Sequence, residues 1–240
     1  MAEDDIGKLK KRFAELAERA ERIGLPQETR FLNMAEQSVL LSMRLPVFLW
    51  GGFEGAERRV AVFGAEETDS VTCLRISPVG GKFAQELTHR DFLGSLMALG
   101  IVRETLGDIV VKDNCGYLFC CASVAPFIEE NLTEVKRTGV RCEPCSDPTV
   151  KSGEGEVRSV VVASERLDAV IAAVWKLPRE EAKALCEKGL VFVDARLAVK
   201  AGSTIPEGAA VSVRGKGRFT YLGLERETKK GKLRVAVSLP

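Results

Sequence analysis

Apolar residues near the start of the chain recur at intervals of three and four positions. Between residues 6 and 23 they are Ile6, Leu9, Phe13, Leu16, Ala20 and Ile23. This spacing places all six on one stripe of an α-helix, and the Gly-Leu-Pro sequence that follows ends it. A second helix is expected from Asn33, whose side chain can cap it while Glu36 reaches back. This second helix must stop before Pro46. The two helices together predict a packed N-terminal helical region over residues 1–56.

The pattern changes from a helical to a strand period at residue 57. Strands are expected from residues 58, 71, 108, 117 and 139, and helices from Thr88 and around Pro126. From residue 71 the expected order is β-α-β-β-α-β, the ferredoxin-like (RRM-like) arrangement that many RNA-recognition modules share. The strand at 58–64 is an extra strand or a lead-in. We therefore predict an α+β protein with a central domain over residues 57–148.

Two aromatic residues lie on the strand that begins at residue 117. Tyr117 or Phe119 can stack on a base, although this segment lacks the full basic and aromatic ribonucleoprotein signature. Since only one face of such a strand is solvated, at least one of the two is expected in the core.

A segment without apolar periodicity separates this domain from a third one. Its Ser, Pro, Gly and charged residues predict a linker at 149–159, followed by a domain at 160–240. There, Ser164 is expected to cap a first helix, Pro178 to occupy the first position of a second, and Gly189 to close it. Strands are expected at 190–193, in one long run at 210–225, and at 232–238.

Composition describes a globular chain of 240 residues, 45% hydrophobic and 29% charged. No apolar run approaches the roughly 18 residues that a membrane span needs. The charged start, MAEDDIGKLKKRF, lacks the apolar core of a signal peptide, so a cytoplasmic location is expected. The seven cysteines are then expected to be reduced and mostly packed in the core.

The net charge of +1 conceals an asymmetry between the two ends of the chain. From residue 160 onward there are 15 lysines and arginines against nine aspartates and glutamates, a balance of +6. The first 159 residues hold the remaining 20 and 25, a balance of −5. A polyanion is therefore the natural partner of the C-terminal domain. An ordinary solvated basic surface is the alternative.

Two arginines stand where helices of this domain are expected to begin, at Arg166 and Arg179. A cation there opposes the helix dipole by about a few tenths of a kcal/mol. The placement is explained if guanidinium groups and unpaired backbone N–H groups face phosphates together. Lys183 lies one turn after Arg179 on the same exposed face. The alternative is that Arg166 pairs with a nearby carboxylate.

The same region resembles the S4 RNA-binding domain. The resemblance is carried by Arg166-Leu167-Asp168, Arg179, Ala182, Gly189-Leu190-Val191, Gly208 and Val211-Ser212-Val213. The chain departs from the usual pattern at Pro178, Asp194-Ala195 and Ala209, which changes turn chemistry and leaves the basic surface in place. The resemblance implies RNA contact by basic residues of this domain, and we assign Arg166, Arg179, Lys183, Arg196, Lys200, Arg214, Lys216 and Arg218.

The chain from about residue 30 to residue 240 resembles the YlmH family of S4 proteins. The most specific segment is His89-Arg90-Asp91-Phe92-Leu93-Gly94, followed by Gly100, Arg103, Gly107 and Asp108. Resemblance implies ribosome association: such proteins bind stalled large subunits carrying peptidyl-tRNA and assist quality control. The implied partners are rRNA, tRNA and the large ribosomal subunit, with no small-molecule substrate, and we expect a monomer. His89, Arg90 and Arg103 are added as RNA-contact candidates, with local capping as the alternative for the first two.

Metal-binding, redox and catalytic sites are less well supported by the residues than RNA binding is. Cys142 and Cys145 form half of a zinc or redox motif, and no second Cys-x-x-Cys accompanies them. The single histidine, His89, argues against Ser-His or Cys-His catalysis. We therefore expect no cofactor, no metal and no enzyme activity. An RNA-modifying protein related to pseudouridine synthases, and a cell-division adaptor that also binds RNA, are the alternatives.

Overall fold

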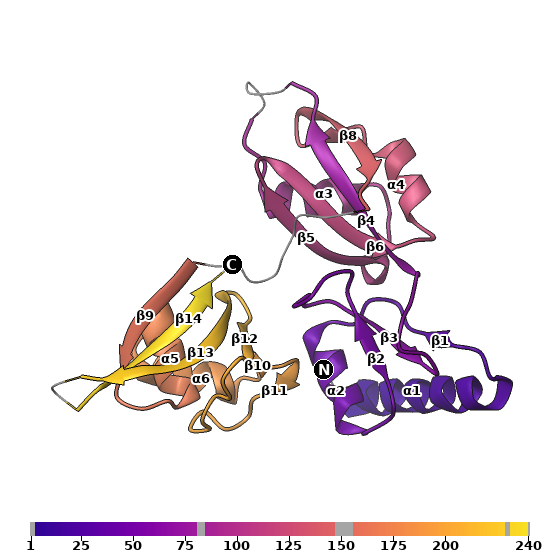
Figure 1. Cartoon of the computed structure of the whole chain (residues 1–240). Coiled ribbons are helices and arrows are strands. Elements are labelled where there is room, and N and C mark those ends of the chain that lie inside the picture. The colour runs from indigo at the N-terminus through magenta and orange to yellow at the C-terminus, as the bar shows by residue number, and fades with distance from the viewer. Residues whose placement is uncertain (1–2, 81–84, 147–155, 229–230, 240) are drawn as a thin grey trace. The chain divides into compact units, whose positions relative to one another are not determined.

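The computed structural model describes residues 3–80, 85–146, 156–228 and 231–239. These form two compact units, residues 1–151 and residues 152–240. Figure 1 shows helices and antiparallel sheets in both units, which is a mixed α+β architecture. The predicted α+β class is confirmed.

The first part of unit 1 is built on the long amphipathic helix that the sequence predicted. Its elements are α1 (Glu3–Ile23), β1 (Gln27–Glu28), α2 (Met34–Ser42), β2 (Phe48–Trp50) and β3 (Val60–Phe63). Phe13 and Ala20 on α1 are buried against Leu40 of α2 and Phe63 of β3, whereas Ile23 at the helix end is 43% exposed. The apolar stripe thus seals α1 and α2 against a small sheet.

Strand β3 belongs to this N-terminal part and not to the central sheet. It pairs with β1 on one side and β2 on the other, in the order β1-β3-β2. The sequence prediction had set the strand at 58–64 beyond the boundary at residue 57. Every residue of β3 is buried, so the strand carries no alternation from which its partners could have been inferred.

The second part of unit 1 contains the elements expected from residue 71. They are β4 (Val71–Pro78), α3 (His89–Ala98), the 3₁₀ turn η2 (Arg103–Thr105), β5 (Leu106–Lys112), β6 (Cys115–Cys121), α4 (Ala125–Asn131), β7 (Glu134–Val135) and β8 (Thr138–Pro144). All strands pair antiparallel in the order β5-β6-β4-β8-β7. Phe92 of α3 and Ile128 of α4 enter one core with Leu74 and Leu118. Both helices therefore cover the same face of this sheet.

The opposite face of that sheet is covered by the loop after β2. Phe53 packs on Phe119 with ring centroids 4.6 Å apart, and Phe119 is 1% exposed. The hypothesis that Phe119 stacks on a base is therefore wrong, because another ring already covers it. Tyr117 is half-buried beside the same cluster.

Unit 2 contains one large sheet with two helices on one face (Figure 1). Its elements are β9 (Glu156–Val162), α5 (Leu167–Trp175), α6 (Arg179–Glu187), β10 (Val191–Val193), β11 (Arg196–Leu197), β12 (Ala210–Val213), β13 (Gly217–Glu227) and β14 (Leu233–Leu239). The sheet order is β11-β10-β12-β13-β14-β9. Val170 and Ile171 of α5 are buried against Val235 and Val237 of β14.

Two strand predictions for this unit need correction. Residues 156–159, expected in the linker, form the first half of β9 and pair with β14, while residues 149–155 lie outside the described residues. The long strand expected at 210–225 is divided into β12 and β13. Gly215 and Gly217 there adopt φ of 80° and 116°, which turns the chain back on itself.

The helix starts of this unit also differ from the prediction. Residue 166 is the N-cap of α5, so Ser164 is not its cap, and Pro178 is the N-cap of α6 rather than its first residue. Gly189 follows the end of α6 with φ of 66°, as predicted for a helix-ending glycine. Asp194 and Ala195 join β10 to β11 with φ of 48° and 62°.

Candidate nucleic-acid interface

Two arginines of unit 2 bind one buried aspartate. Arg166 donates from Nε and Nη2 to Oδ1 and Oδ2 of Asp168, each at 3.1 Å. Arg179 donates from Nε to Oδ2 at 3.1 Å and from Nη2 to Oδ1 at 3.3 Å. Each arginine side chain is 47% exposed, whereas that of Asp168 is 3% exposed. The cluster therefore presents two half-exposed guanidinium groups around one buried carboxylate, with a formal charge of +1.

Local backbone geometry brings Arg179 to Asp168 across eleven positions of sequence. Helix α5 ends at Lys176, whose left-handed φ of 53° reverses the chain. Pro178 then opens α6 so that Arg179 lies in its first turn, close to the first turn of α5. The sequence predicted a shared location for the arginines and left open that Arg166 pairs with a local carboxylate. In the structure the two arginines share one site, and Arg166 is also paired with a local carboxylate, that of Asp168.

The ionised form of Asp168 is favoured although the side chain is buried. Burial by itself raises the pKa of a carboxyl group. Hydrogen bonds and charges from Arg166 and Arg179 outweigh burial, so the pKa of Asp168 is lowered from its ordinary value. Asp168 is thus a carboxylate at neutral pH and keeps both guanidinium groups attached.

A loop that follows β11 closes one side of the arginine cluster. The backbone N–H groups of Leu167 and Asp168 donate to the carbonyls of Ser203 and Ala201, both at 2.9 Å. A Cβ at Gly202 would lie 3.0 Å from Nη2 of Arg166 and 3.2 Å from its Cζ. Glycine therefore leaves the space that the guanidinium group needs against this loop.

The other basic candidates of unit 2 are exposed or half-buried, and several have local partners. Nζ of Lys216 lies 3.3 Å from Glu181 Oε1, which links the β12–β13 turn to α6. Nζ of Lys183 lies 3.8 Å from Glu187 Oε1. The Cζ atom of Arg214 lies 5.6 Å from the ring centroid of Phe192.

Three further basic candidates belong to unit 2. Arg196 begins β11 and is exposed, Lys200 is exposed in the loop that follows, and Arg218 is half-buried on β13. The structure therefore brings Arg166 and Arg179 together in one site, whereas the remaining basic candidates belong to α6, β11, the loop after β11, the β12–β13 turn and β13.

The candidates of unit 1 separate into two exposed residues and one with a structural role. His89 and Arg90 begin α3 and are exposed. Arg103 donates from Nη1 to the carbonyls of Leu106 at 2.5 Å and Gly107 at 3.4 Å. Burial and the neighbouring Arg58 lower its pKa to about 10, so it remains charged at neutral pH. Arg103 holds the start of β5 in place.

The N-terminus of α3 is capped by Asp91, a residue of the helix itself. The backbone N–H and the hydroxyl of Thr88 both donate to Oδ2 of Asp91, at 2.9 and 2.8 Å. These bonds are the local capping that the sequence left open as an alternative to phosphate contact. His89 is exposed but partly shielded from solvent, and this partial desolvation together with the charge of Arg103 lowers its pKa, so this histidine is mostly neutral at neutral pH.

The thiols that form half of a metal or redox motif lie on the central sheet. Cys142 is on β8, and the backbone N–H of Cys145 donates to the carbonyl of Cys73 at 2.9 Å. Burial raises the pKa of Cys142 to about 12, which keeps this thiol protonated at neutral pH. Within the described ranges, no group of three or more metal-ligating side chains is present.

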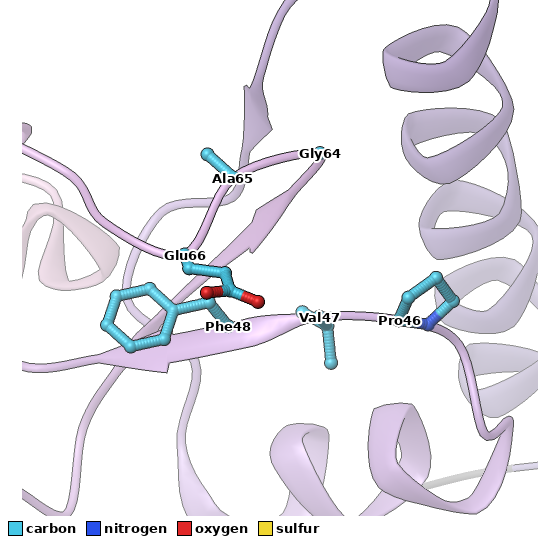
Figure 2. A pocket seen from close by; sticks show the side chains of 6 residues that line it. All are labelled: Pro46, Val47, Phe48, Gly64, Ala65 and Glu66. Carbon is cyan, nitrogen blue, oxygen red and sulfur yellow. The ribbon is translucent and has the colours of Figure 1, made fainter.

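A hollow of about 710 Å³ lies beside β2 in unit 1. Figure 2 shows that its lining comes from the segment leading into β2 and from the turn after β3; the residues are Pro46, Val47, Phe48, Gly64, Ala65 and Glu66. The one charged side chain of this set is an acid, which repels phosphate. We therefore place no nucleic-acid contact there.

Among the described residues, no helix has the length and apolarity to cross a membrane.

Comparison with known proteins adds evidence of a different kind. Residues 70–147 match a family model described as "Putative RNA-binding domain in YlmH". The ribosome-associated protein quality control protein P2 of Bacillus subtilis (strain 168) is 31% identical over 217 residues, covering 86% of this chain and 84% of that protein. The chain belongs to the YlmH family. The cell division protein ylmH from Streptococcus pneumoniae has a solved structure that covers 60% of this YlmH-family chain and 93% of its own, with a TM-score of 0.47 and 22% identity.

Several residues that organise this YlmH-family protein were not assigned a role from sequence. Asp168 belongs to the motif that begins at Arg166, yet its contact with both arginines was not foreseen. Asp108 accepts from the backbone N–H groups of Glu57 at 2.6 Å and Arg58 at 3.2 Å. Arg58 in turn donates to the carbonyls of Leu106 at 2.9 Å and Phe31 at 3.2 Å. The signal that could have found Asp168 and Asp108 is their place in the motif segments that carry the resemblance, whereas Arg58 lies outside those segments.

Proposed function

We propose that this protein binds RNA on the ribosome and acts in ribosome-associated quality control. Support comes from the Bacillus subtilis relative, whose name states that role and which aligns with most of this chain. The match of residues 70–147 to a family model for RNA binding supports the same function. The alignment covers 84% of the relative, so the similarity extends over nearly the whole of both proteins and is not confined to one domain.

Two parts of the chain contain the RNA-binding candidates, and we propose a domain type for each. The central part is an RRM-like domain, which the order β4-α3-β5-β6-α4-β8 and the all-antiparallel sheet favour. Unit 2 is an S4 domain, which the helix pair α5–α6 and the motif residues at its start favour.

The paired arginines support RNA contact independently of the comparisons. The arginines at the starts of α5 and α6 keep about half of their side-chain surface exposed while both are bonded to Asp168. Guanidinium groups present N–H donors in a planar fork that fits phosphate oxygens, and they lose little freedom when already held. A polyanion with regularly spaced phosphates is the partner that such a surface fits.

The finer assignment is that rRNA and tRNA of the large subunit are the partners, and that a monomer binds them without catalysis. The C-terminal balance of +6 favours nucleic acid over an acidic protein patch when it is combined with paired guanidinium groups. Binding rather than reaction is favoured because the polar groups with unusual environments, Asp168 and Arg103, hold other residues in place.

Ribosome gradients test this function with the full chain. Lysate is sedimented through sucrose with and without RNase, and the protein is located by immunoblot. Wild type is expected to co-migrate with large subunits. The Arg166→Ala, Arg179→Ala double variant is expected to shift to the top of the gradient. A matched double variant, Arg158→Ala with Arg226→Ala, removes the same charge from exposed positions of the same unit and is expected to stay with the ribosome. Absence of wild-type protein from all ribosomal fractions would refute the proposal.

A further inference from the structure

Asp168 binds two cationic side chains that would otherwise repel each other. We propose that Asp168 is a positioning residue for RNA binding: it aligns the guanidinium groups of Arg166 and Arg179 so that their outer N–H groups form one site for a backbone phosphate. Gly202 assists by leaving room for Arg166. This inference rests on the proposed function and names the residues that prepare its binding site.

Four hydrogen bonds from the two arginines occupy the acceptor positions of the Asp168 carboxylate. Each oxygen of Asp168 accepts one bond from each arginine, at distances of 3.1 to 3.3 Å. A carboxylate offers about four lone-pair positions, so no acceptor capacity remains for a further partner. Each guanidinium group uses its Nε–H and one Nη2–H in these bonds. The groups on Nη1 and the second Nη2–H remain for an incoming anion.

The charges of the cluster favour an anion at its outer side. Two guanidinium groups bonded to the same carboxylate lie within a few ångströms of each other, where like charges repel in proportion to inverse distance. Asp168 offsets one positive charge and leaves one. A phosphate on the exposed side then completes an alternating array of cations and anions. The buried carboxylate, 3% exposed, lies behind the arginines and presents little of its own charge to the RNA.

Fixed geometry lowers the cost of binding. An unrestrained arginine loses roughly 0.5–1.5 kcal/mol of side-chain freedom when it is immobilised at an interface. Here much of that freedom is already lost, because both guanidinium groups are held by paired bonds and Arg166 lies against the loop at Gly202. The backbone N–H of Asp168 bonds to the carbonyl of Ala201, so the carboxylate itself is anchored.

Replacement of the aspartate by its neutral isostere separates positioning from simple charge. Asp168→Asn raises the net charge of the protein by one, which by itself strengthens attraction to RNA. The positioning role instead predicts that affinity for fluorescein-labelled tRNA falls about tenfold at about 0.1 M salt, since the arginines lose their common anchor. Glu180→Gln is the matched control: it adds the same charge beside Arg179 on an exposed site, and affinity is expected to stay equal or rise. Equal or tighter binding by folded Asp168→Asn would overturn the inference.

A second variant moves an arginine without changing any charge. Gly202→Ala places a methyl group 3.0 Å from Nη2 of Arg166, so the guanidinium group must shift and its bonds to Asp168 lengthen. Affinity for tRNA is expected to fall about threefold with no change in melting temperature, because the position is exposed. Gly139→Ala, where a Cβ meets nothing within 4 Å, is the control. Unchanged affinity in Gly202→Ala would count against the inference even if Asp168→Asn does not fold.

Arginine side-chain NMR provides a readout that stability alone does not move. In the wild type, the Nε–H signals of Arg166 and Arg179 are expected to be sharp and protected from exchange, and in folded Asp168→Asn both are expected to broaden. If wild-type protein fails to bind tRNA, the proposed function is at fault. If wild type binds and Arg166→Ala weakens binding while neither Asp168→Asn nor Gly202→Ala does, only the positioning role is refuted.

Discussion

Ala195 adopts a backbone conformation that suits another residue. Its φ of 62° lies in the left-handed region, where a Cβ costs about 1–2 kcal/mol and glycine costs little. Ala195→Gly is therefore expected to stabilise unit 2 by about 0.5–1 kcal/mol, after the added freedom of the unfolded chain and the lost methyl burial are subtracted. Urea denaturation measures this change. Ala198→Gly, in the same hairpin region without positive φ, should destabilise by a similar amount, and a loss of stability in Ala195→Gly would contradict the assignment of strain.

His89 provides a residue-scale prediction with a defined sign. Partial burial and Arg103 lower its pKa, so the folded protein binds this proton less readily than the unfolded chain does. The resulting stability is fully present above the ordinary histidine pKa of about 6.5 and decreases as pH falls through it. His89→Gln is expected to reduce the decline in unfolding free energy between about pH 7.5 and 5.5. Thermal melts across this range test it, and an identical decline in the variant would rule out His89 as its source.

At the same scale, the sequence located the arginines of the candidate site and missed the residue that joins them. Helical spacing indicated that Arg179 faces solvent, which the 47% exposure of its side chain confirms, and Arg166 was placed at the start of the neighbouring helix. Asp168 was not foreseen as buried, because a charged side chain is buried only with partners. Its second partner lies eleven positions away across a turn, a separation that helix periodicity does not describe.

Among the elements, α2 tests how far a helix depends on its first residue. Asn33 Oδ1 accepts from the backbone N–H groups of Ala35 at 2.9 Å and Glu36 at 3.1 Å, and the carboxylate of Glu36 accepts from the N–H of Asn33 at 2.7 Å. Asn33→Ala is expected to cost about 1 kcal/mol of unfolding free energy. Asn33→Asp, which keeps the acceptor, should cost less in the same denaturation experiment. Equal losses would show that the side-chain acceptor is not what stabilises the start of α2.

Glycine, proline and capping residues marked several helix boundaries correctly, although Ser164 and Pro178 in unit 2 were placed wrongly, and the shortest strands were not predicted. Gly24, Asn33, Pro126 and Gly189 each marked an end or a start that the structure confirms. The two-residue strands β1, β7 and β11 are too short for any period to show. The division between β12 and β13 was missed although Gly215 and Gly217 signalled it, because the alternating pattern continues on both sides of the turn.

For the whole molecule, charge asymmetry predicts how binding responds to salt. Removal of one side chain that neutralises a phosphate should reduce the slope of log affinity against log salt by about 0.7–0.9. The Arg166→Ala, Arg179→Ala variant of the full chain is therefore expected to lower the slope for tRNA by about 0.7–0.9, because the two arginines together hold one phosphate. Anisotropy titrations at several salt concentrations measure it. Arg158→Ala with Arg226→Ala should change the slope less, and an equal change would mean that net charge alone governs binding.

The first and last described strands of unit 2, β9 and β14, are neighbours in its sheet. Leu239 of β14 lies opposite Glu156 of β9 in the antiparallel register, so the entrance and the exit of this unit adjoin. A module with this connectivity can be inserted into another protein, or given new ends at a surface turn, without breaking its sheet. The β12–β13 turn around Gly215 is a suitable place for such new ends. Because Glu156 and Leu239 adjoin, the two junctions that an insertion requires would lie side by side in the host chain.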